Sequence, residues 1–212
     1  MKTTHYTIWG KRTLDLFVAC TGLIVVSPLF ALLAVLIKVT SKGPVFYRQE
    51  RVGRSGKLFR IAKFRSMYLH ADRSGLLVTS AGDPRVTPVG RILRRLKLDE
   101  LPQLWNVLKG EMSLVGPRPE VPCYVKSYST SQRQVLTVRP GITDPVSILY
   151  RHEEKTLGEQ ADPERYYREV VMPDKLNLNL EYLNHISLSY DLSVLLRTTG
   201  CLFLPKWRLT RS

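Results

Sequence analysis

Two adjacent carboxylates, Asp99 and Glu100, lie in a stretch of the chain that is otherwise rich in basic residues. The sequence predicts that they open a short helix with Pro102 in its first turn, where a missing N–H leaves no hydrogen bond unmade. Helix capping and the helix dipole also favour acidic residues here, so the pair has an ordinary structural interpretation. Its surroundings favour catalysis on a phosphorylated substrate, because the neighbouring basic residues are Arg91, Arg94, Arg95 and Lys97.

Arg118 lies between Pro117 and Pro119, whose rings fix the backbone φ angle on both sides of it. A guanidinium on such a stiff loop suits bidentate binding of a phosphate group, although a rigid surface turn would give the same pattern. Lys63 and Arg65 form a second pair of candidate phosphate-binding residues. Lysine and arginine are common on exposed strands, so this pair indicates a phosphate site only if it lies close to the two carboxylates.

The composition indicates a polyanionic partner. The 32 Lys and Arg residues outnumber the 18 Asp and Glu residues and leave a formal charge of +14. Nucleic acid, anionic lipid and phosphorylated substrates all fit this charge, but no nucleic-acid-binding motif is apparent, so we expect no nucleic-acid partner. The three cysteines are widely spaced without a CxxC pair, which predicts neither a disulfide framework nor a zinc site.

An uncharged, apolar run of 22 residues, 16–37, indicates a membrane segment. As a helix it would be about 33 Å long, close to the thickness of the hydrocarbon core of a bilayer. A cleaved signal peptide and a buried core helix are alternatives, but no clear cleavage site follows the run and a core helix usually keeps a polar face. A plain span and a re-entrant hairpin remain.

The sequence favours the re-entrant interpretation, with the helix break at Ser27 and Pro28. Proline removes one backbone hydrogen bond, and the serine hydroxyl could serve as a local partner for the carbonyl that is left. Basic residues flank both ends of the run, so a simple span would export one basic cluster, against the positive-inside tendency. We expect Arg12 and Asp15 to lie in the lipid headgroup zone.

The rest of the chain predicts a small, mainly helical domain. Thr87 is a candidate N-cap, and Gly110 a candidate helix end. The expected elements are a β-hairpin of 45–49 and 57–61 around a turn at 53–56, a loop at 72–84, helices over 88–97 and 101–108, weakly amphipathic helices over 162–173 and 180–197, and an interfacial tail at 203–208.

The predicted fold class is therefore mainly α with a small β-hairpin (α+β), in a monotopic membrane protein. Residues 1–42 would form the N-terminal membrane-inserted re-entrant helix. Residues 43–212 would form a cytosolic domain whose surface carries amphipathic helices.

A series of motifs in this order resembles the bacterial sugar transferases, also called monotopic phosphoglycosyl transferases, in their minimal form. The resemblance runs from about residue 10 to 200. The motifs are Lys11-Arg12-x-Leu14-Asp15, Ser27-Pro28, Gly43 to Gln49, Val52-Gly53, Lys63 to Met67, Leu98 to Gln103, Gly110 to Pro119 and Arg139 to Thr143. The strings around Asp99 and Arg118 are the most specific of these. The run Asp144 to Ser147 departs from the family pattern in a region expected to face the nucleotide or the sugar.

The resemblance implies a two-step transfer at a membrane surface. A UDP-sugar gives its sugar-1-phosphate to an active-site carboxylate and releases UMP, and undecaprenyl (polyprenyl) phosphate then takes the group as the first membrane step of glycan synthesis. The family location is the bacterial inner membrane, with the catalytic domain on the cytoplasmic face. A homo-oligomer is compatible with this assignment.

The resemblance also implies roles for individual residues. Asp99 is the expected nucleophile and Glu100 its partner, with Mg²⁺ bound beside both. Arg118 and Lys63 are expected to hold phosphate oxygens, with Arg65 as a further phosphate-binding candidate. An aspartyl-phosphate intermediate would divide one difficult displacement into two steps.

Two alternatives remain at the level of sequence. A non-enzymatic membrane-surface protein that binds anionic lipid or nucleic acid would explain the charge and the apolar run, but not the paired carboxylates. A magnesium-dependent hydrolase that cleaves nucleotide sugars would share the site but would need no lipid acceptor.

Overall fold

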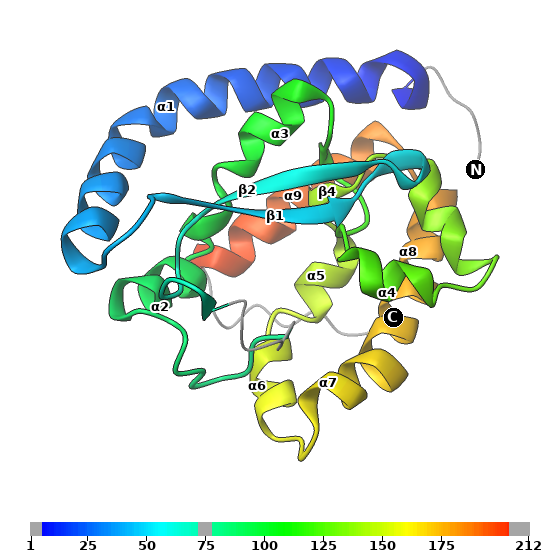
Figure 1. Cartoon of the computed structure of the whole chain (residues 1–212). Coiled ribbons are helices and arrows are strands. Elements are labelled where there is room, and N and C mark those ends of the chain that lie inside the picture. The colour runs from blue at the N-terminus through cyan, green and yellow to red at the C-terminus, as the bar shows by residue number, and fades with distance from the viewer. Residues whose placement is uncertain (1–5, 72–77, 204–212) are drawn as a thin grey trace.

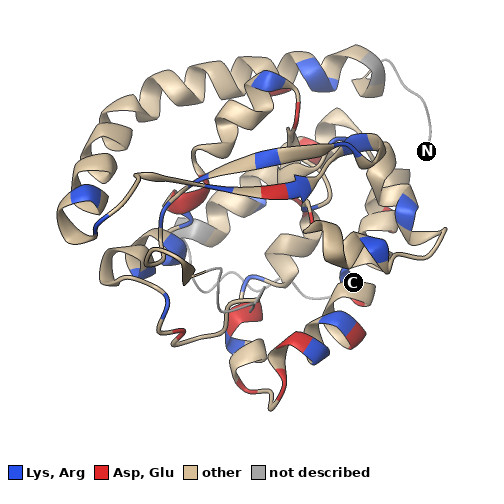
Figure 2. Cartoon of the chain, in the orientation of Figure 1, with Lys and Arg blue, Asp and Glu red and all other residues tan. Residues whose placement is uncertain are grey.

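The computed structural model describes residues 6–71 and 78–203, and it confirms a mostly helical fold with small sheets (Figure 1). A long N-terminal helix, α1 (Lys11–Thr40), runs along one side of the molecule after a single turn, η1 (Tyr6–Gly10). Within the described residues, α1 is the one helix that is long and apolar enough to cross a membrane. Residues 16–37 of α1 carry no charged side chain, and basic residues lie near both ends of the helix (Figure 2).

Helix α1 continues through Ser27 and Pro28, where the sequence predicted a break. Pro28 has no N–H to bond the carbonyl of Ile24, and the hydroxyl of Ser27 donates to that carbonyl at 2.8 Å. The predicted serine partner is therefore confirmed. The helix curves along its length instead of separating into two segments (Figure 1). Insertion as a re-entrant helix remains a prediction.

The N-terminal half of α1 packs closely on the folded body. Asp15 is 2% exposed, and its Oδ1 accepts hydrogen bonds from the backbone N–H of Leu114 (2.9 Å) and the hydroxyl of Ser113 (3.0 Å). The guanidinium of Arg12 donates to the carbonyls of Val107 (2.7 Å) and Leu108. Both side chains therefore bind backbone groups of the body, and their position in the headgroup zone remains a prediction.

The C-terminal half of α1 packs on the same body at a second place. Leu33 and Ile37 are buried in a cluster with Phe64 and Leu93, and the ring of Phe30 meets that of Phe64 edge to face. Between the two contacts, many apolar side chains of α1 are exposed, including Phe17 and Ile24. Helix α1 is therefore attached near both ends, and its outer side has no protein partner among the described residues.

The predicted β-hairpin is confirmed and is longer than expected. Strands β1 (Phe46–Val52) and β2 (Leu58–Phe64) pair antiparallel, with Val52 opposite Leu58. A short turn, η2 (Arg54–Gly56), joins them, and Gly56 adopts φ 76°, a conformation that glycine accepts without strain.

The two central helices begin and end at the predicted signals. The Thr87 side chain accepts from the N–H of Gly90 at the start of α2 (Pro88–Arg95). Helix α3 (Gln103–Lys109) ends at Gly110, which has φ 80°. A 3₁₀ turn, η4 (Leu98–Glu100), separates the two helices. In Figure 1, α3 lies between the hairpin and α1, whereas α2 lies below the hairpin near the C-terminal end of α1.

A second sheet, which the sequence analysis did not predict, joins distant parts of the chain. Strand β3 (Ser113–Val115) pairs in parallel with β4 (Gly141–Thr143). The connection between them includes α4 (Pro122–Lys126) and η5 (Gln132–Thr137), and the chain continues into α5 (Pro145–Leu149) and α6 (Glu153–Gly158). The parallel pair brings the Pro117–Pro119 loop next to β4.

The C-terminal helices have different boundaries from those predicted. Helix α7 (Pro163–Tyr166), η6 (Tyr167–Val171) and α8 (Met172–Asn184) form one continuous helical stretch, and α9 (Leu188–Phe203) follows. Buried side chains at helical spacing, such as Leu176 and Leu183, extend α8 past the predicted end at 173. The break comes at 185–187, where the Ser187 hydroxyl accepts from the N–H of Tyr190. The predicted tail at 203–208 lies outside the described residues from 204 onward.

Candidate active site

The two carboxylates lie in the η4 turn between α2 and α3. Asp99 is 4% exposed and Glu100 is 8% exposed. Lys97, which precedes the turn, adopts a left-handed conformation with φ 56°. The N-cap position of α3 is Pro102, without a side-chain capping bond, so capping of α3 does not account for the pair.

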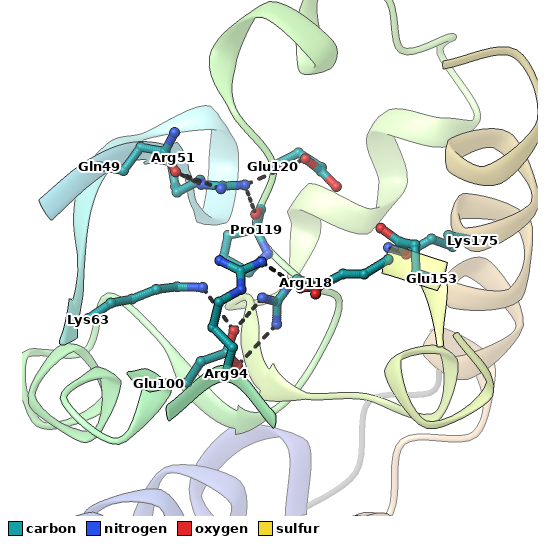
Figure 3. Close-up of polar contacts among 11 residues, drawn as sticks. Gln49, Arg51, Lys63, Arg94, Glu100, Arg118, Pro119, Glu120, Glu153 and Lys175 are labelled. Atoms are coloured by element: carbon teal, nitrogen blue, oxygen red, sulfur yellow. Dashed lines mark hydrogen bonds and ion pairs between the residues drawn. The ribbon is translucent and has the colours of Figure 1, made fainter. Parts of the chain in front are cut away.

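Glu100 is held between two cations (Figure 3). The ammonium of Lys63 donates to its Oε1 at 2.8 Å, and the guanidinium of Arg118 donates to Oε1 at 2.5 Å and to Oε2 at 3.3 Å. Burial alone would raise the pKa of Glu100, but Arg118 and then Lys63 outweigh it and hold that pKa well below its ordinary value. Glu100 is therefore an anion that fixes two basic side chains in place.

The Pro117–Pro119 loop positions Arg118 through backbone contacts. The N–H of Gly116 donates to the carbonyl of Thr143 (3.0 Å), and the N–H of Arg118 donates to the carboxylate of Asp144 (3.0 Å). A side chain at Gly116 would meet the carbonyl of Arg139 at 2.6 Å, so only glycine fits there. Asp144 is buried and also caps α5 at Ser147.

Sequence reasoning missed the role of Asp144. The Asp144 to Ser147 run was expected to face the nucleotide or the sugar, whereas this aspartate holds the backbone of the Arg118 loop. Burial raises the pKa of Asp144, and the N–H of Ser147 opposes the rise. The Asp-Pro pair at the start of a helix was the available signal, since aspartate before an N1 proline is a common N-cap.

Lys63 reaches the site from β2, opposite Tyr47 in the hairpin. Burial lowers the pKa of the Lys63 ammonium, and the negative charge of Glu100 opposes that shift. Both candidate phosphate-binding cations therefore meet at Glu100, and their binding of phosphate oxygens stays a prediction. Arg94 lies nearby and is paired with Glu154 at 2.5 Å.

Arg65 does not join this group. Its guanidinium donates to the carbonyls of Ser41 (2.8 Å) and Lys42 (2.9 Å) at the C-terminal end of α1. The guanidinium can approach these carbonyls because residue 43 is glycine. A Cβ atom at Gly43 would lie 2.1 Å from the Arg65 guanidinium. The structure thus places the Arg65 guanidinium on carbonyls just past the end of α1 instead of beside Glu100, and a phosphate-binding role for Arg65 stays a prediction.

Asp99 differs sharply from its neighbour. Its Oδ1 atom is buried and finds no hydrogen-bond partner in the described part of the chain. Burial raises the pKa of Asp99; Lys63 opposes this rise and the charge of Glu100 adds to it. A buried carboxylate oxygen with unused lone pairs can attack an electrophile or bind a cation.

The residues present fit a magnesium ion through Asp99. Among residues 6–71 and 78–203 there is no group of three or more His, Cys, Asp or Glu side chains that could hold a metal ion. Magnesium commonly takes one or two carboxylates and completes its shell with water and substrate phosphate oxygens. The unpaired Oδ1 of Asp99 suits this arrangement, whereas both oxygens of Glu100 already face cations.

Small pockets lie on both sides of the Arg118 loop. One is lined by Gly53, Pro119 and Pro140 together with Arg118. The other has Arg118 at one end and reaches α8, with Tyr128, Tyr167, Lys175 and Asn179 in its lining. Each pocket has room for only about one water molecule, so neither is a formed ligand cavity in this structure.

Comparison with known proteins extends these observations. Residues 6–205 match the sequence model of the family described as bacterial sugar transferase. A UDP-N-acetylgalactosamine-undecaprenyl-phosphate N-acetylgalactosaminephosphotransferase of Aeromonas hydrophila is 37% identical over 193 residues, which cover 89% of this chain and 42% of that protein. A UDP-glucose:undecaprenyl-phosphate glucose-1-phosphate transferase of Escherichia coli strain K12 is 36% identical over 204 residues, 92% of this chain and 40% of that protein.

A third relative is similar in length to this chain. The exopolysaccharide production protein ExoY of Sinorhizobium fredii is 33% identical over 212 aligned residues, which cover 93% of this chain and 87% of that protein. The chain thus spans less than half the length of the first two relatives and most of the length of the third.

Proposed function

The chain belongs to the bacterial sugar transferase family, and from this premise we propose that it transfers a sugar-1-phosphate from a UDP-sugar to undecaprenyl or another polyprenyl phosphate. One observation carries the proposal. Asp99 is a buried carboxylate with an unpaired oxygen, and the next residue, Glu100, holds two cations in ion pairs. A non-enzymatic lipid-binding surface gives no reason for this arrangement.

Asp99 is the nucleophile of the proposed first step. Its carboxylate oxygen forms a bond to the phosphorus that carries the sugar, and the bond from this phosphorus to the bridging oxygen breaks. The electron pair leaves with UMP, and the sugar-phosphate remains on Asp99. In the second step an oxygen of the polyprenyl phosphate attacks the same phosphorus, and the electron pair of the broken bond returns to Asp99.

Lys63 and Arg118 neutralise the approaching phosphates. An anionic carboxylate and an anionic diphosphate repel each other, and fixed cations at the point of contact offset that repulsion. Glu100 positions both cations before substrate arrives, so little reorganisation is needed during reaction. Bound Mg²⁺, held through Asp99, would supply further charge stabilisation for the diphosphate.

The shape of α1 supports a position in which both ends of the helix lie at one face of the membrane, together with the folded body that carries the site. Both halves of the helix contact one folded body, at Asp15 and at Ile37, and the apolar side chains between them are exposed. A helix that enters a bilayer and returns to the same face satisfies these contacts. We propose this re-entrant arrangement at the bacterial inner membrane, with the body on the cytoplasmic face where UDP-sugars occur.

Release of UMP in the absence of acceptor tests the proposal. At stoichiometric enzyme with UDP-N-acetylgalactosamine or UDP-glucose and Mg²⁺, we expect a burst of UMP close to one equivalent and no free sugar-1-phosphate. The Asp99→Asn variant should fold and give no burst. Continuous release of UMP and sugar phosphate without lipid would indicate a hydrolase, and turnover by the variant would exclude Asp99 as the nucleophile.

A further inference from the structure

Gln103, one helical turn after Asp99, is a buried amide whose donor group is unused. It is the first residue of α3 and is 1% exposed. Its Nε2 atom finds no hydrogen-bond partner among the residues that the structure describes. Buried side-chain amides are almost always paired, because an unmade bond to a desolvated donor costs free energy. The sequence analysis assigned no role to this residue.

The unused donor of Gln103 and the unused acceptor of Asp99 belong to one helical stretch. The backbone between them is right-handed, with φ −53° and ψ −36° at Leu101 and φ −61° and ψ −14° at Pro102. Side chains four residues apart in such a backbone share a face and can bond each other. Here Asp99 Oδ1 and Gln103 Nε2 are both unpaired, so this bond is not made.

Asn106, three residues further along α3, shows what a structural amide looks like in the same helix. Its Nδ2 donates to the carbonyl of Arg60 (2.8 Å) and to the carboxylate of Glu111 (2.7 Å). Its Oδ1 accepts from the N–H of Ala62 (2.9 Å), so this side chain ties α3 to β2. The surroundings of α3 therefore do supply partners to a buried amide, whereas the donor of Gln103, four residues after Asp99, is left unpaired.

We propose that Gln103 is a catalytic hydrogen-bond donor for the transferred phosphoryl group. Its Nε2 donates to a non-bridging phosphoryl oxygen while the sugar-phosphate is attached to Asp99, and this assignment rests on the proposed function. Attachment of the group brings new acceptor oxygens to the face that Asp99 and Gln103 share. Gln103 makes no covalent bond and transfers no proton, because its amide N–H stays in place throughout.

A donor that is unpaired before reaction and paired during it lowers the barrier selectively. The interaction is absent in the free enzyme, so it stabilises the transition state and the intermediate more than the starting state. A neutral amide also complements Lys63 and Arg118, since it adds a directed bond without another positive charge. Its charge state does not change with pH, in contrast to a lysine at this place.

Two substitutions of Gln103 and one matched control test the proposal. Gln103→Met keeps the approximate size without a donor, Gln103→Glu keeps the shape and replaces the donor nitrogen by oxygen, and Asn106→Leu removes the paired amide. The full chain is measured in detergent with UDP-N-acetylgalactosamine or UDP-glucose, by UMP release in a single turnover and by thermal unfolding.

We expect the two amides to respond in opposite ways. Removal of one preorganised donor typically slows a reaction roughly 100- to 1,000-fold, so both Gln103 variants should release UMP more slowly by about that factor. The KM of Gln103→Met for the donor should stay within about twofold, because the lost bond forms after binding. In Gln103→Glu the added negative charge also repels the diphosphate, so its KM should rise. Gln103→Met should unfold at the wild-type temperature or above it, whereas Asn106→Leu should unfold at a lower temperature.

A wild-type rate of UMP release in Gln103→Met or Gln103→Glu would overturn the proposal. A fall in the unfolding temperature of Gln103→Met as large as that of Asn106→Leu would also overturn it, since the amide would then be structural. The Asp99→Asn variant separates this failure from that of the proposed function. If Asp99→Asn is inactive and Gln103→Met is normal, only the role of Gln103 is lost.

Discussion

Two buried aspartates lie in contrasting regions of the molecule, Asp15 where α1 meets β3 and Asp99 in the η4 turn. The carboxylate of Asp15 accepts from Leu114 and Ser113. The carboxylate of Asp99 is similarly buried, yet its Oδ1 has no partner among the described residues. The same side chain thus has an anchoring role in one region and is left available for chemistry in the other.

The difference shows how a fold separates stability from reactivity. Backbone and hydroxyl donors at β3 match the lone pairs of Asp15, so its burial strengthens the junction with α1. At Asp99 no donor bonds Oδ1, and Lys63, whose charge acts on Asp99, donates its hydrogen bond to Glu100 instead. The chain therefore has a carboxylate whose hydrogen-bonding capacity is free for a ligand.

Replacement by leucine should abolish transfer activity at Asp99 and lower the unfolding temperature at Asp15. The loss of activity at Asp99 is the largest effect that we expect. Loss of a catalytic nucleophile commonly slows turnover by roughly 10⁴-fold or more, so we expect Asp99→Leu to abolish detectable sugar-phosphate transfer. Its unfolding temperature should not fall, because an unpaired buried carboxylate is replaced by an apolar side chain. Radiolabelled UDP-sugar transfer and thermal unfolding measure the two effects. A clear loss of stability at Asp99 would contradict the comparison.

On the acid side, the pH dependence of transfer should follow the protonation of Asp99. The raised pKa of Asp99 means that protonation, which removes the nucleophile, begins at a higher pH than for an ordinary aspartate. Because only the ionised form attacks, kcat/KM should fall as pH decreases through that pKa, by about tenfold per pH unit below it. The profile is measured with saturating Mg²⁺ between pH 4 and 8. Substitution at Ser113 should leave the profile unchanged, and a shift would show that the two regions are coupled.

Asp15→Leu should reverse the pattern seen at Asp99. The N–H of Leu114 would lose its partner in a buried position, which costs about 1–3 kcal/mol of folding free energy. We expect a lower unfolding temperature and, for the fraction that stays folded, a wild-type rate of UMP release. A normal unfolding temperature would mean that the contact of α1 with β3 adds little to stability.

Ser113→Ala removes one of the two donors to Asp15 and should have the smallest effect. The Leu114 N–H remains bonded, so the expected loss is about 0.5–1.5 kcal/mol. Transfer activity should be unchanged. Thermal unfolding alongside Asp15→Leu checks the order of the two effects, and a larger loss for Ser113→Ala would contradict it.

Features that depend on nearby residues could be predicted from the sequence. The hairpin, the Thr87 cap and the end of α3 at Gly110 each follow from a few adjacent residues, and all three are confirmed. The pairing of β3 with β4 could not be predicted in this way, because strands of three residues carry little signal and the partners are distant in sequence.

The site was predictable in its composition but not in its contacts. The motif resemblance grouped Lys63, Glu100 and Arg118 correctly, and the structure adds that Glu100 binds both cations. The contacts of Arg65 could not be predicted, because nothing local shows that the end of α1 lies against it. The contacts of Asp15 could not be predicted for the same reason, since its partners lie almost 100 residues away.

The attachment of α1 near both ends has a mechanical consequence. A single-span helix adapts to thicker or thinner bilayers by tilting, but a helix fixed to one body at Asp15 and Ile37 has no such freedom. In the proposed re-entrant arrangement, its exposed apolar side would reach a depth set by the protein, and the lipid would have to deform around it. A bilayer deformed locally around the helix would hold the phosphate of the proposed polyprenyl phosphate acceptor at a constant height relative to the η4 turn.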